Sequence, residues 1–440
     1  MAMKSIKNLI PITLILILFP LCTDKGQIKI NIKNDRDLYG TPFSIHITRL
    51  SPGEKVTLSA FSEDASGSEW TTSSDLTATS SGKIILSFDD PPENNPQRTD
   101  LYGYLSSMHP ADNSNKNYHY DRENRFKIRF TVTNSAGQST SSELVRYYSK
   151  PEAELLCDTL DVNGLKGFLY YPEGKNRSYP GIILLSGAQG GLEKWLARII
   201  ASHGYAVLAL AYFKYQGLPE SLVEIPLEYF EKAIEWMKTN QHVTKDRIGL
   251  VGGSKGGELA LLLGSKYDVF RVIVAWMPAA HVWQAISLSP QSSWSLNGQG
   301  LPYVPYGYTQ EDMENLQTGK LTSFRSFYHL GLQNADESTI ARAAIPVENI
   351  RASILLVSDT DDQCWPSSEF CNMIMQRLAE NNFKYGMEHI CTQNGGHTAF
   401  LPDLIPDLNR NFNGGNAEDQ LKASQLIWKT TLEQLKKSLK

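Results

Sequence analysis

Two patterns of hydrophobic residues in this chain predict an all-β domain followed by a larger α/β domain. Over residues 25–150, short runs alternate apolar and polar side chains and are separated by turn residues, which is typical of an immunoglobulin-like β-sandwich. Over residues 151–440, continuous apolar runs alternate with amphipathic segments, which predicts a mostly parallel, doubly wound sheet with helices on both faces. A third observation, an apolar segment at the N-terminus, predicts that both domains are exported.

Residues 1–24 have the layout of a secretory signal. Lys4 and Lys7 precede a run of about a dozen mainly apolar residues, and a polar segment follows. The run is short for a transmembrane helix, which needs about 20 residues. Cys22 stands at its end, where a bacterial lipoprotein carries its lipidated cysteine, although Leu21 occupies the position of the usual small residue. We therefore expect a periplasmic, secreted or lipid-anchored protein that meets a membrane only through Cys22; the alternative is a cleaved signal with Cys22 discarded.

In the first domain, strands are predicted wherever apolar residues recur at every second position. These runs cover residues 28–32, 44–48, 56–61, 83–88, 126–133 and 144–148. Clusters of Gly, Pro, Ser, Asn and Asp between them supply the turns. The histidines of this domain, His46, His109 and His119, are interpreted as structural or surface residues.

In the second domain, predicted strands and helices alternate. The strands are expected at residues 181–185, 205–211, 248–251, 272–275, 354–357 and 385–390. The helices are expected at residues 192–202, 227–239, 256–265 and 419–440. Residues 287–344 interrupt the alternation and are rich in Ser, Gly, Pro and aromatic residues, so we predict a lid over the active site there, with an irregular surface excursion as the alternative.

Composition and spacing exclude several classes of function. The formal net charge is −5, so no broad basic surface for nucleic acid is implied. The chain shows no zinc-type cysteine spacing, Walker loop or dinucleotide fingerprint, and we expect neither a metal nor an organic cofactor. In an oxidising compartment some cysteines can pair, and the alternative is that all stay free; those concerned are Cys157, Cys364, Cys371 and Cys391.

The strongest motif is the pentapeptide Gly-Gly-Ser-Lys-Gly at residues 252–256, which matches the G-x-S-x-G nucleophile elbow of α/β-hydrolases. A predicted strand precedes it and a predicted helix follows. Glycine is needed beside the serine because a Cβ would collide in so tight a turn, and the N-terminus of the helix points at the hydroxyl. We therefore predict an α/β-hydrolase domain with Ser254 as nucleophile; an ordinary glycine-rich turn is the alternative.

A serine nucleophile needs a base that is held by an acid. In this fold the acid precedes the histidine along the chain, and Asp359, Asp361 and Asp362 all lie in the loop after the fifth predicted strand. We favour Asp362, with Asp361 second, because α/β-hydrolases commonly place a proline four residues after the acid, where Pro366 stands. His397 follows the last predicted strand behind two glycines and is the predicted base.

The same chemistry needs an oxyanion hole. One donor is expected to be the backbone N–H of Lys255, directly after the nucleophile. The second is expected from the glycine-rich loop at residues 186–191, through the N–H of Ala188 or Gln189; the alternative is that this loop only starts a helix. Two further histidines, His281 and His329, lie in or near the predicted lid, where a contact with substrate stays open, and His389 is interpreted as structural.

Six segments are similar to those of one known family. They are residues 50–58, 208–212, 227–231, 254–259, 345–348 and 361–365, of which Ser-Lys-Gly-Gly-Glu from Ser254 is the most specific string. On these segments the chain resembles the acyl-CoA thioesterases of peroxisomal and mitochondrial type, together with bile acid-CoA:amino acid N-acyltransferase. The resemblance covers nearly everything after the signal. It implies the triad Ser254, Asp362 and His397, and a sandwich domain that helps to shape the active-site entrance.

The resemblance also implies a reaction that begins with attack on an acyl thioester to give an acyl-enzyme. Water then releases the acid, or an amine captures the acyl group. Serine as nucleophile favours hydrolysis, because the amidating member of the family uses cysteine. The best-known members are intracellular, whereas this chain carries an export signal, so we expect a small-molecule acyl ester or thioester, with acyl-CoA as one candidate. An acyltransferase and a catalytically silent binding protein are the alternatives.

Overall fold

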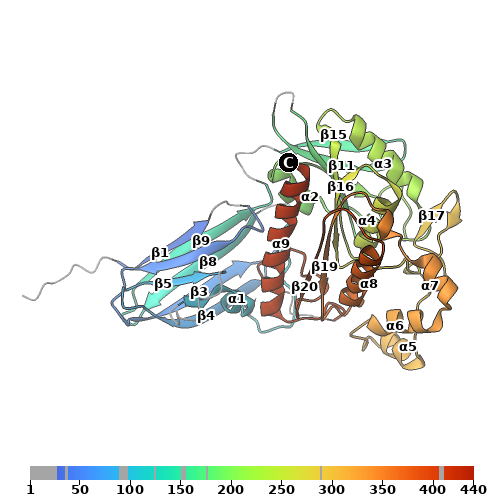
Figure 1. Cartoon of the computed structure of the whole chain (residues 1–440). Helices are drawn as coiled ribbons and strands as arrows, with labels where there is room; N and C mark the ends of the chain where they lie inside the picture. Colours follow the sequence, from blue (N-terminus) through green and yellow to red (C-terminus); the bar gives the residue numbers. More distant parts are fainter. Residues whose placement is uncertain are drawn as a thin grey trace, which may run out of the picture.

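The computed structural model describes residues 27–34, 38–88, 98–122, 125–149, 155–174, 177–287, 290–405 and 411–440. The predicted signal and Cys22 lie outside the described residues. Figure 1 shows an elongated all-β domain beside a larger α/β domain, with helix α9 (Ala417–Leu439) standing at the junction between them. This arrangement confirms the predicted fold class.

The first domain consists of two packed sheets. One has the strand order β1 (Lys29–Asn34), β2 (Phe43–Thr48), β5 (Ile84–Ser87) and β6 (Arg98–Asp100). The other has the order β7 (His109–Pro110), β4 (Glu69–Thr77), β3 (Lys55–Glu63), β8 (Arg125–Asn134) and β9 (Ser139–Tyr147), and the short helix α1 (Leu101–Ser106) precedes β7. Alternate residues of β2 and β3 are buried, as a two-layer sandwich requires.

The second domain is built on one eight-stranded sheet. Its order is β10 (Leu155–Val162), β11 (Leu165–Pro172), β13 (Ala206–Ala211), β12 (Tyr179–Leu185), β15 (Val243–Gly253), β16 (Phe270–Trp276), β19 (Ser353–Asp359) and β20 (Met387–Thr392). From β13 to β20 every neighbouring pair is parallel, whereas β10 and β11 join one edge in antiparallel orientation. The carboxyl ends of the parallel strands therefore share one edge, where ligands of such sheets bind.

Helices cover both faces of this sheet. Helices α2 (Lys194–Ser202) and α9 pack on one face, and their apolar side chains belong to a hydrophobic core that continues into the sandwich. Helices α3 (Leu227–Thr239), α4 (Lys255–Lys266) and α8 (Ser367–Glu380) pack on the other face around a second core. The two domains thus share one buried core on the side of α2 and α9 (Figure 1).

Residues 287–344, for which no regular elements were predicted, contain short elements. Strands β17 (Trp294–Leu296) and β18 (Gln299–Gly300) form a small sheet with β14 (Ile225–Pro226). Helices α5 (Gln310–Gln317), α6 (Arg325–Asn334) and α7 (Glu337–Ala343) follow, and the turn η1 (Val347–Asn349) leads back to β19. Helix α5 buries none of its side chains, so it has no apolar stripe that a sequence pattern could show.

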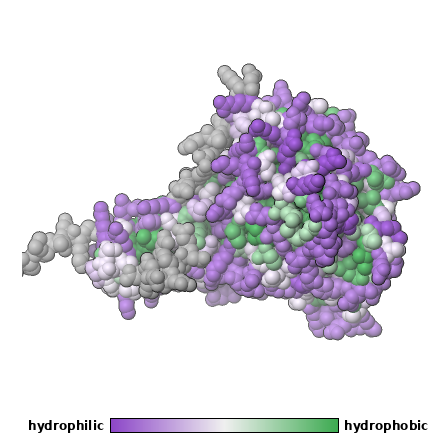
Figure 2. All heavy atoms as spheres, viewed as in Figure 1, coloured by the Kyte–Doolittle hydropathy of each residue, from purple (hydrophilic) through white to green (hydrophobic). Residues whose placement is uncertain are grey.

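Hydrophilic side chains predominate on the face of the molecule that Figure 2 shows, and hydrophobic areas on it are smaller and separated. Within the described part of the chain, no helix has both the length and the apolar character needed to cross a membrane.

Candidate active site

Ser254 lies in a strained turn between strand β15 and helix α4. Its backbone has φ 57° and ψ −124°, a left-handed conformation that a non-glycine residue rarely adopts. Its N–H donates to the carbonyl oxygen of Trp276 at 2.8 Å. A Cβ on Gly252 would collide with the carbonyl oxygen of Gly256, and a Cβ on Gly256 would lie 2.5 Å from the carbonyl oxygen of Ser186. The geometry is therefore that of a nucleophile elbow, with the hydroxyl at the N-terminus of α4.

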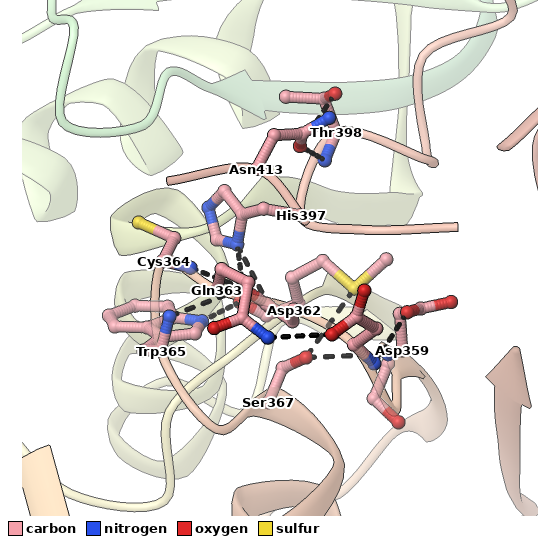
Figure 3. Close-up of polar contacts among 12 residues, drawn as sticks. Asp359, Asp362, Gln363, Cys364, Trp365, Ser367, His397, Thr398 and Asn413 are labelled. Atoms are coloured by element: carbon pink, nitrogen blue, oxygen red, sulfur yellow. Dashed lines mark hydrogen bonds and ion pairs between the residues drawn. The ribbon is translucent and has the colours of Figure 1, made fainter. Parts of the chain in front are cut away.

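Asp362 and His397 form a close, buried pair (Figure 3). Nδ1 of His397 lies 2.9 Å from each carboxylate oxygen of Asp362. The carboxylate is fully buried, and its Oδ1 also accepts hydrogen bonds from the backbone N–H groups of Cys364 at 3.0 Å and Trp365 at 3.2 Å. The backbone N–H of His397 donates to the carbonyl oxygen of Asn413 at 2.8 Å. These bonds hold both side chains of the pair in place.

Two effects of opposite sign act on the imidazole of His397. Burial is the largest single effect and favours the neutral ring, but Asp362 and Cys364 together outweigh it and raise the pKa of His397 well above its ordinary value. The charged imidazolium is therefore stabilised. This is what a general base requires once it has taken a proton from a nucleophile.

The two competing aspartates have other partners. Asp359 accepts a hydrogen bond from the backbone N–H of Gly395 at 2.9 Å, and Asp361 accepts one from the backbone N–H of Gly415 at 2.7 Å. Both carboxylates therefore brace the loops around the histidine, without a hydrogen bond to its ring. The geometry favours Asp362 as the acid of the candidate triad.

Ser254 and His397 line one cavity of about 370 Å³. Its other walls are mainly apolar and include Leu185, Trp195, Leu196, Trp276, Phe400 and Leu401. Among the described residues, no hydrogen bond joins the hydroxyl of Ser254 to the imidazole of His397. Catalytic hydrogen bonds are often long in structures without substrate and tighten when substrate binds. The structure thus pairs the candidate acid and base, and places the candidate nucleophile on the same cavity.

The predicted oxyanion donors lie beside Ser254, the candidate nucleophile. Ala188 and Gln189 line the same cavity, on a loop that turns where the N–H of Gly190 donates to the carbonyl oxygen of Gly187 at 3.1 Å. Within the described chain, no hydrogen bond uses the backbone N–H of Ala188, Gln189 or Lys255. All three N–H groups are therefore available to donate to an oxyanion. The structure does not distinguish between Ala188 and Gln189 as the second donor.

Arg122, which no sequence pattern predicted, is contributed to the cavity wall by the sandwich domain. Its guanidinium donates to both carboxylate oxygens of Asp403, at 2.6 and 2.8 Å. It also lies 4.0 Å from the ring centre of Trp195 and 4.4 Å from that of Tyr120. Because Arg122 and Asp403 are far apart in the sequence and belong to different domains, no local motif marks the pair.

A buried ion pair begins directly after Ser254. Nζ of Lys255 lies 2.9 and 2.8 Å from the two carboxylate oxygens of Glu258, and both side chains are almost completely buried. Nε1 of Trp294, from the segment 287–344, donates to the same carboxylate at 2.7 Å. Burial raises the pKa of Glu258 and lowers that of Lys255, and the partner charge opposes both shifts. The pair joins the elbow helix to the inserted segment.

The segment 287–344 contacts the acid loop and contributes no described residue to the wall of this cavity. The N–H of Phe324 donates to the carbonyl oxygen of Gln363 at 2.9 Å, and the guanidinium of Arg325 donates to that of Asp362 at 3.0 Å. These contacts support the loop from the side of helix α6. The role of this segment as a lid stays a prediction.

Among the remaining described histidines and cysteines, Cys364 alone lines the cavity. His281 and His329 are not among the residues that line the cavity, and the ring of His389 hydrogen-bonds the hydroxyl of Ser358 at 2.7 Å. All cysteines in the described part of the chain are free: Cys157, Cys364, Cys371 and Cys391. In the same part, no group of three or more His, Cys, Asp or Glu side chains has the geometry to hold a metal ion.

The mixed sheet, its strand–turn–helix elbow and the buried Asp–His pair define an α/β-hydrolase fold behind a β-sandwich. Two models of one family match the sequence. The region described as "BAAT / Acyl-CoA thioester hydrolase C terminal" matches residues 225–440, and the region described as "Acyl-CoA thioester hydrolase/BAAT N-terminal region" matches residues 40–155. The chain belongs to this family of acyl-CoA thioester hydrolases and bile acid-CoA:amino acid N-acyltransferases.

Curated relatives carry both kinds of name. Acyl-coenzyme A thioesterase 6 of Mus musculus is 26% identical over 408 residues, which span 89% of this chain and 92% of the relative. Bile acid-CoA:amino acid N-acyltransferase of Mus musculus is 25% identical over 425 residues, 91% of this chain and 96% of the relative. Acyl-coenzyme A amino acid N-acyltransferase 1 of Mus musculus is 32% identical, but only over 50% of this chain and 49% of its own length.

Solved structures resemble the chain more distantly. A dienelactone hydrolase of Klebsiella pneumoniae has a TM-score of 0.42 at 14% identity and matches 64% of this chain and 99% of its own. An arylesterase has a TM-score of 0.40 at 16% identity and matches 66% of this chain and 87% of its own. Likeness of this degree says nothing about substrate.

Proposed function

We propose that this protein is a serine-dependent hydrolase that cleaves an acyl thioester or ester through an acyl-enzyme intermediate. The observation that supports this most is the geometry around one cavity, which is lined both by Ser254 of the elbow and by His397 of the buried Asp362–His397 pair. Membership of the family supports an acyl substrate, and the relatives named thioesterases support hydrolysis. The proposed catalytic residues are Ser254, Asp362 and His397.

In the proposed mechanism, His397 takes the proton of Ser254 as the hydroxyl oxygen attacks the acyl carbon. Asp362 keeps Nδ1 protonated and stabilises the imidazolium that forms. The backbone N–H of Lys255, with that of Ala188 or Gln189, donates to the oxyanion. His397 then protonates the leaving thiol or alcohol. Water, activated by the same imidazole, hydrolyses the acyl-enzyme and restores Ser254.

The cavity supports an acyl group as the part of the substrate that is bound. Leu185, Leu196 and Leu401 give it aliphatic walls, and the rings of Trp276 and Phe400 stack 5.3 Å apart beside them. Apolar walls of this kind bind a hydrocarbon chain by removing its surface from water. An exported location would favour an oxygen ester over acyl-CoA. We therefore propose an acyl substrate whose leaving group is either a thiol or an alcohol.

The experiment is a comparison of thiol release from acyl-CoAs of different chain lengths with the hydrolysis of p-nitrophenyl esters. The protein without its predicted signal is compared with its Ser254→Ala variant, and circular dichroism confirms that both are folded. We expect turnover of at least one substrate class by the unsubstituted protein only. Equal turnover by the folded Ser254→Ala variant would overturn the proposal.

Transfer to an acceptor is the second candidate, because a relative named an N-acyltransferase shares 32% identity over half of this chain. Product analysis with and without glycine or taurine separates the two reactions. Formation of a conjugate that rises with the acceptor concentration would establish transfer, and its absence at every concentration excludes it. A silent binding protein, the third reading, predicts that a fluorophosphonate probe leaves Ser254 unlabelled.

We propose export through the N-terminal segment as well, with or without a lipid on Cys22. The support is the basic and then apolar pattern of residues 1–24. Intact mass measured on protein from the native host tests it. A mature chain that still begins at Met1 would contradict export, and a diacylated N-terminal cysteine would establish the lipid anchor.

A further inference from the structure

One tryptophan of the inserted segment 287–344 is connected to both sides of the proposed oxyanion hole. Trp294 lies on strand β17, and its side chain is fully buried. It is not among the residues that line the cavity with Ser254 and His397. Any effect of Trp294 on the reaction must therefore pass through the residues that it contacts in the core.

On the first side, Trp294 holds the carboxylate that is paired with Lys255. Nε1 of Trp294 donates to Oε1 of Glu258 at 2.7 Å, and the two oxygens of this carboxylate lie 2.9 and 2.8 Å from Nζ of Lys255. All three side chains are almost completely buried. Lys255 is the first residue of helix α4, and its backbone N–H is the donor expected directly after the nucleophile. The hydrogen bond from Trp294 therefore fixes the group to which this donor residue is tied.

On the second side, Trp294 packs against the tyrosine that holds the glycine-rich loop at residues 186–191. The ring centres of Trp294 and Tyr212 lie 6.0 Å apart, with an angle of 49° between the ring planes. The hydroxyl of Tyr212 donates to the carbonyl oxygen of Ser186 at 2.5 Å, in a buried hydrogen bond. Ser186 begins the loop that carries both alternatives for the second oxyanion donor. The position of this loop thus depends on a side chain against which Trp294 packs.

The two sides also contact each other closely. A Cβ on Gly256 of helix α4 would lie 2.5 Å from the carbonyl oxygen of Ser186, so the helix and the loop are packed backbone against backbone. A protein interior of such density transmits small shifts instead of absorbing them. Since a donor must lie about 2.7–3.1 Å from the oxyanion, a displacement of a few tenths of an ångström in the core is enough to weaken the hole.

We propose that Trp294 is a positioning residue through which the inserted segment sets the geometry of both oxyanion donors. This inference rests on the proposed function. The hydrogen bond to Glu258 and the packing against Tyr212 then act on the transition state, in which the oxyanion exists, and change substrate binding little. This role differs from that of a lid, because it requires neither movement of the segment nor contact between Trp294 and the substrate.

The experiment measures ester hydrolysis together with inhibition by an alkyl trifluoromethyl ketone, whose adduct with Ser254 places an oxyanion in the hole. Replacing Trp294 with benzothienylalanine removes the N–H donor and keeps the shape of the ring, and Tyr212→Phe removes only the hydroxyl that donates to Ser186. In each variant we expect kcat to fall by about 10-fold, less than the roughly 10²–10³-fold loss caused by removing a whole donor. KM should stay within about twofold, and the inhibition constant of the ketone should rise by the factor by which kcat falls.

Trp283→Phe is the matched control, because Trp283 is also fully buried in the same core and its Nε1 has no hydrogen-bond partner among the described residues. It should keep kcat and the inhibition constant unchanged, whatever its loss in Tm. Unchanged values in the benzothienylalanine variant or in Tyr212→Phe, or equal losses in Trp283→Phe, would overturn the inference while the proposed function stands. An unsubstituted protein that neither turns over an ester or thioester nor binds the ketone would overturn the proposed function, and the role of Trp294 with it.

Discussion

Replacing Glu258 by glutamine should destabilise the protein severely, because the change removes the only negative charge that contacts the buried ammonium of Lys255 among the described residues. Breaking a buried ion pair costs about 3–5 kcal/mol, since the remaining charge has neither solvent nor partner. The hydrogen bond from Trp294 to the carboxylate is weakened by the same change. We therefore expect a loss of about 4 kcal/mol in the free energy of unfolding for Glu258→Gln.

The assay is thermal unfolding followed by circular dichroism. For a domain of roughly 290 residues the unfolding entropy is about 0.6 kcal/mol/K, so a loss of about 4 kcal/mol lowers Tm by about 7 °C. The double variant Lys255→Met/Glu258→Met removes both charges and should recover most of that loss, because a buried pair replaced by apolar residues is often neutral or stabilising. A Tm for Glu258→Gln within about 1 °C of the unsubstituted protein, or a double variant less stable than the single one, would refute the reasoning.

Three further predictions concern the cavity. The Asp362 carboxylate raises the pKa of His397, and the base must be neutral to act, so the acid limb of the kcat/KM profile should lie above pH 6.5. The Asp362→Asn substitution should move this limb to lower pH and reduce kcat by on the order of 10⁴-fold. A pH–rate series measures both effects. Arg122→Ala should lower the free energy of unfolding by about 2 kcal/mol and raise KM, whereas Arg122→Lys should recover only part of the stability; urea unfolding and steady-state kinetics check this. Gly256→Ala should abolish soluble folded protein or turnover, because its Cβ would press on the carbonyl oxygen of Ser186; normal activity in that variant would contradict the tight elbow.

The linkage of His397 to stability has a definite sign. A histidine whose folded pKa exceeds its unfolded pKa stabilises the fold fully below the unfolded value, about 6.5, and this contribution is lost as the pH rises through the folded pKa. Stability and activity should therefore respond to pH in opposite directions in this range.

Local patterns were enough to predict most of the parallel strands and the elbow. The apolar run of β12 and the strand–Gly–x–Ser–x–Gly–helix order around Ser254 are properties of consecutive residues, so the sequence displays them directly. The antiparallel edge formed by β10 and β11 was not predicted, although Asn163 and Gly164 have positive φ in its two-residue turn and mark a hairpin. Strand β4 was not predicted either, because its inner face carries small polar residues beside Trp70.

Site residues could be predicted where a local motif marks them. They could not be predicted where their role depends on contacts between residues far apart in the sequence. The choice of Asp362 among three aspartates depended on a proline offset, and its hydrogen bonds to His397 now give that choice a geometric basis. Arg122 shows no motif because its ion-pair partner, Asp403, belongs to the other domain. No motif marks Asn413 either, whose carbonyl oxygen accepts the hydrogen bond from the N–H of His397. Cys364 stood within a recognised segment, but only the fold shows that it lines the same cavity as His397.

The contacts of Arg122 also bear on whether the α/β domain can fold without the sandwich domain. Without the sandwich, Asp403 would lose its cation, the ring of Trp195 would lose the group stacked on it, and the N–H of Ile405 would lose the Tyr120 oxygen that accepts from it at 2.7 Å. Trp195 lines the same cavity as His397, and Asp403 and Ile405 follow His397 by only a few residues in the sequence. The boundary near residue 150 therefore divides the sequence and the architecture into two domains. A fragment that begins there would lack contacts that the α/β domain needs.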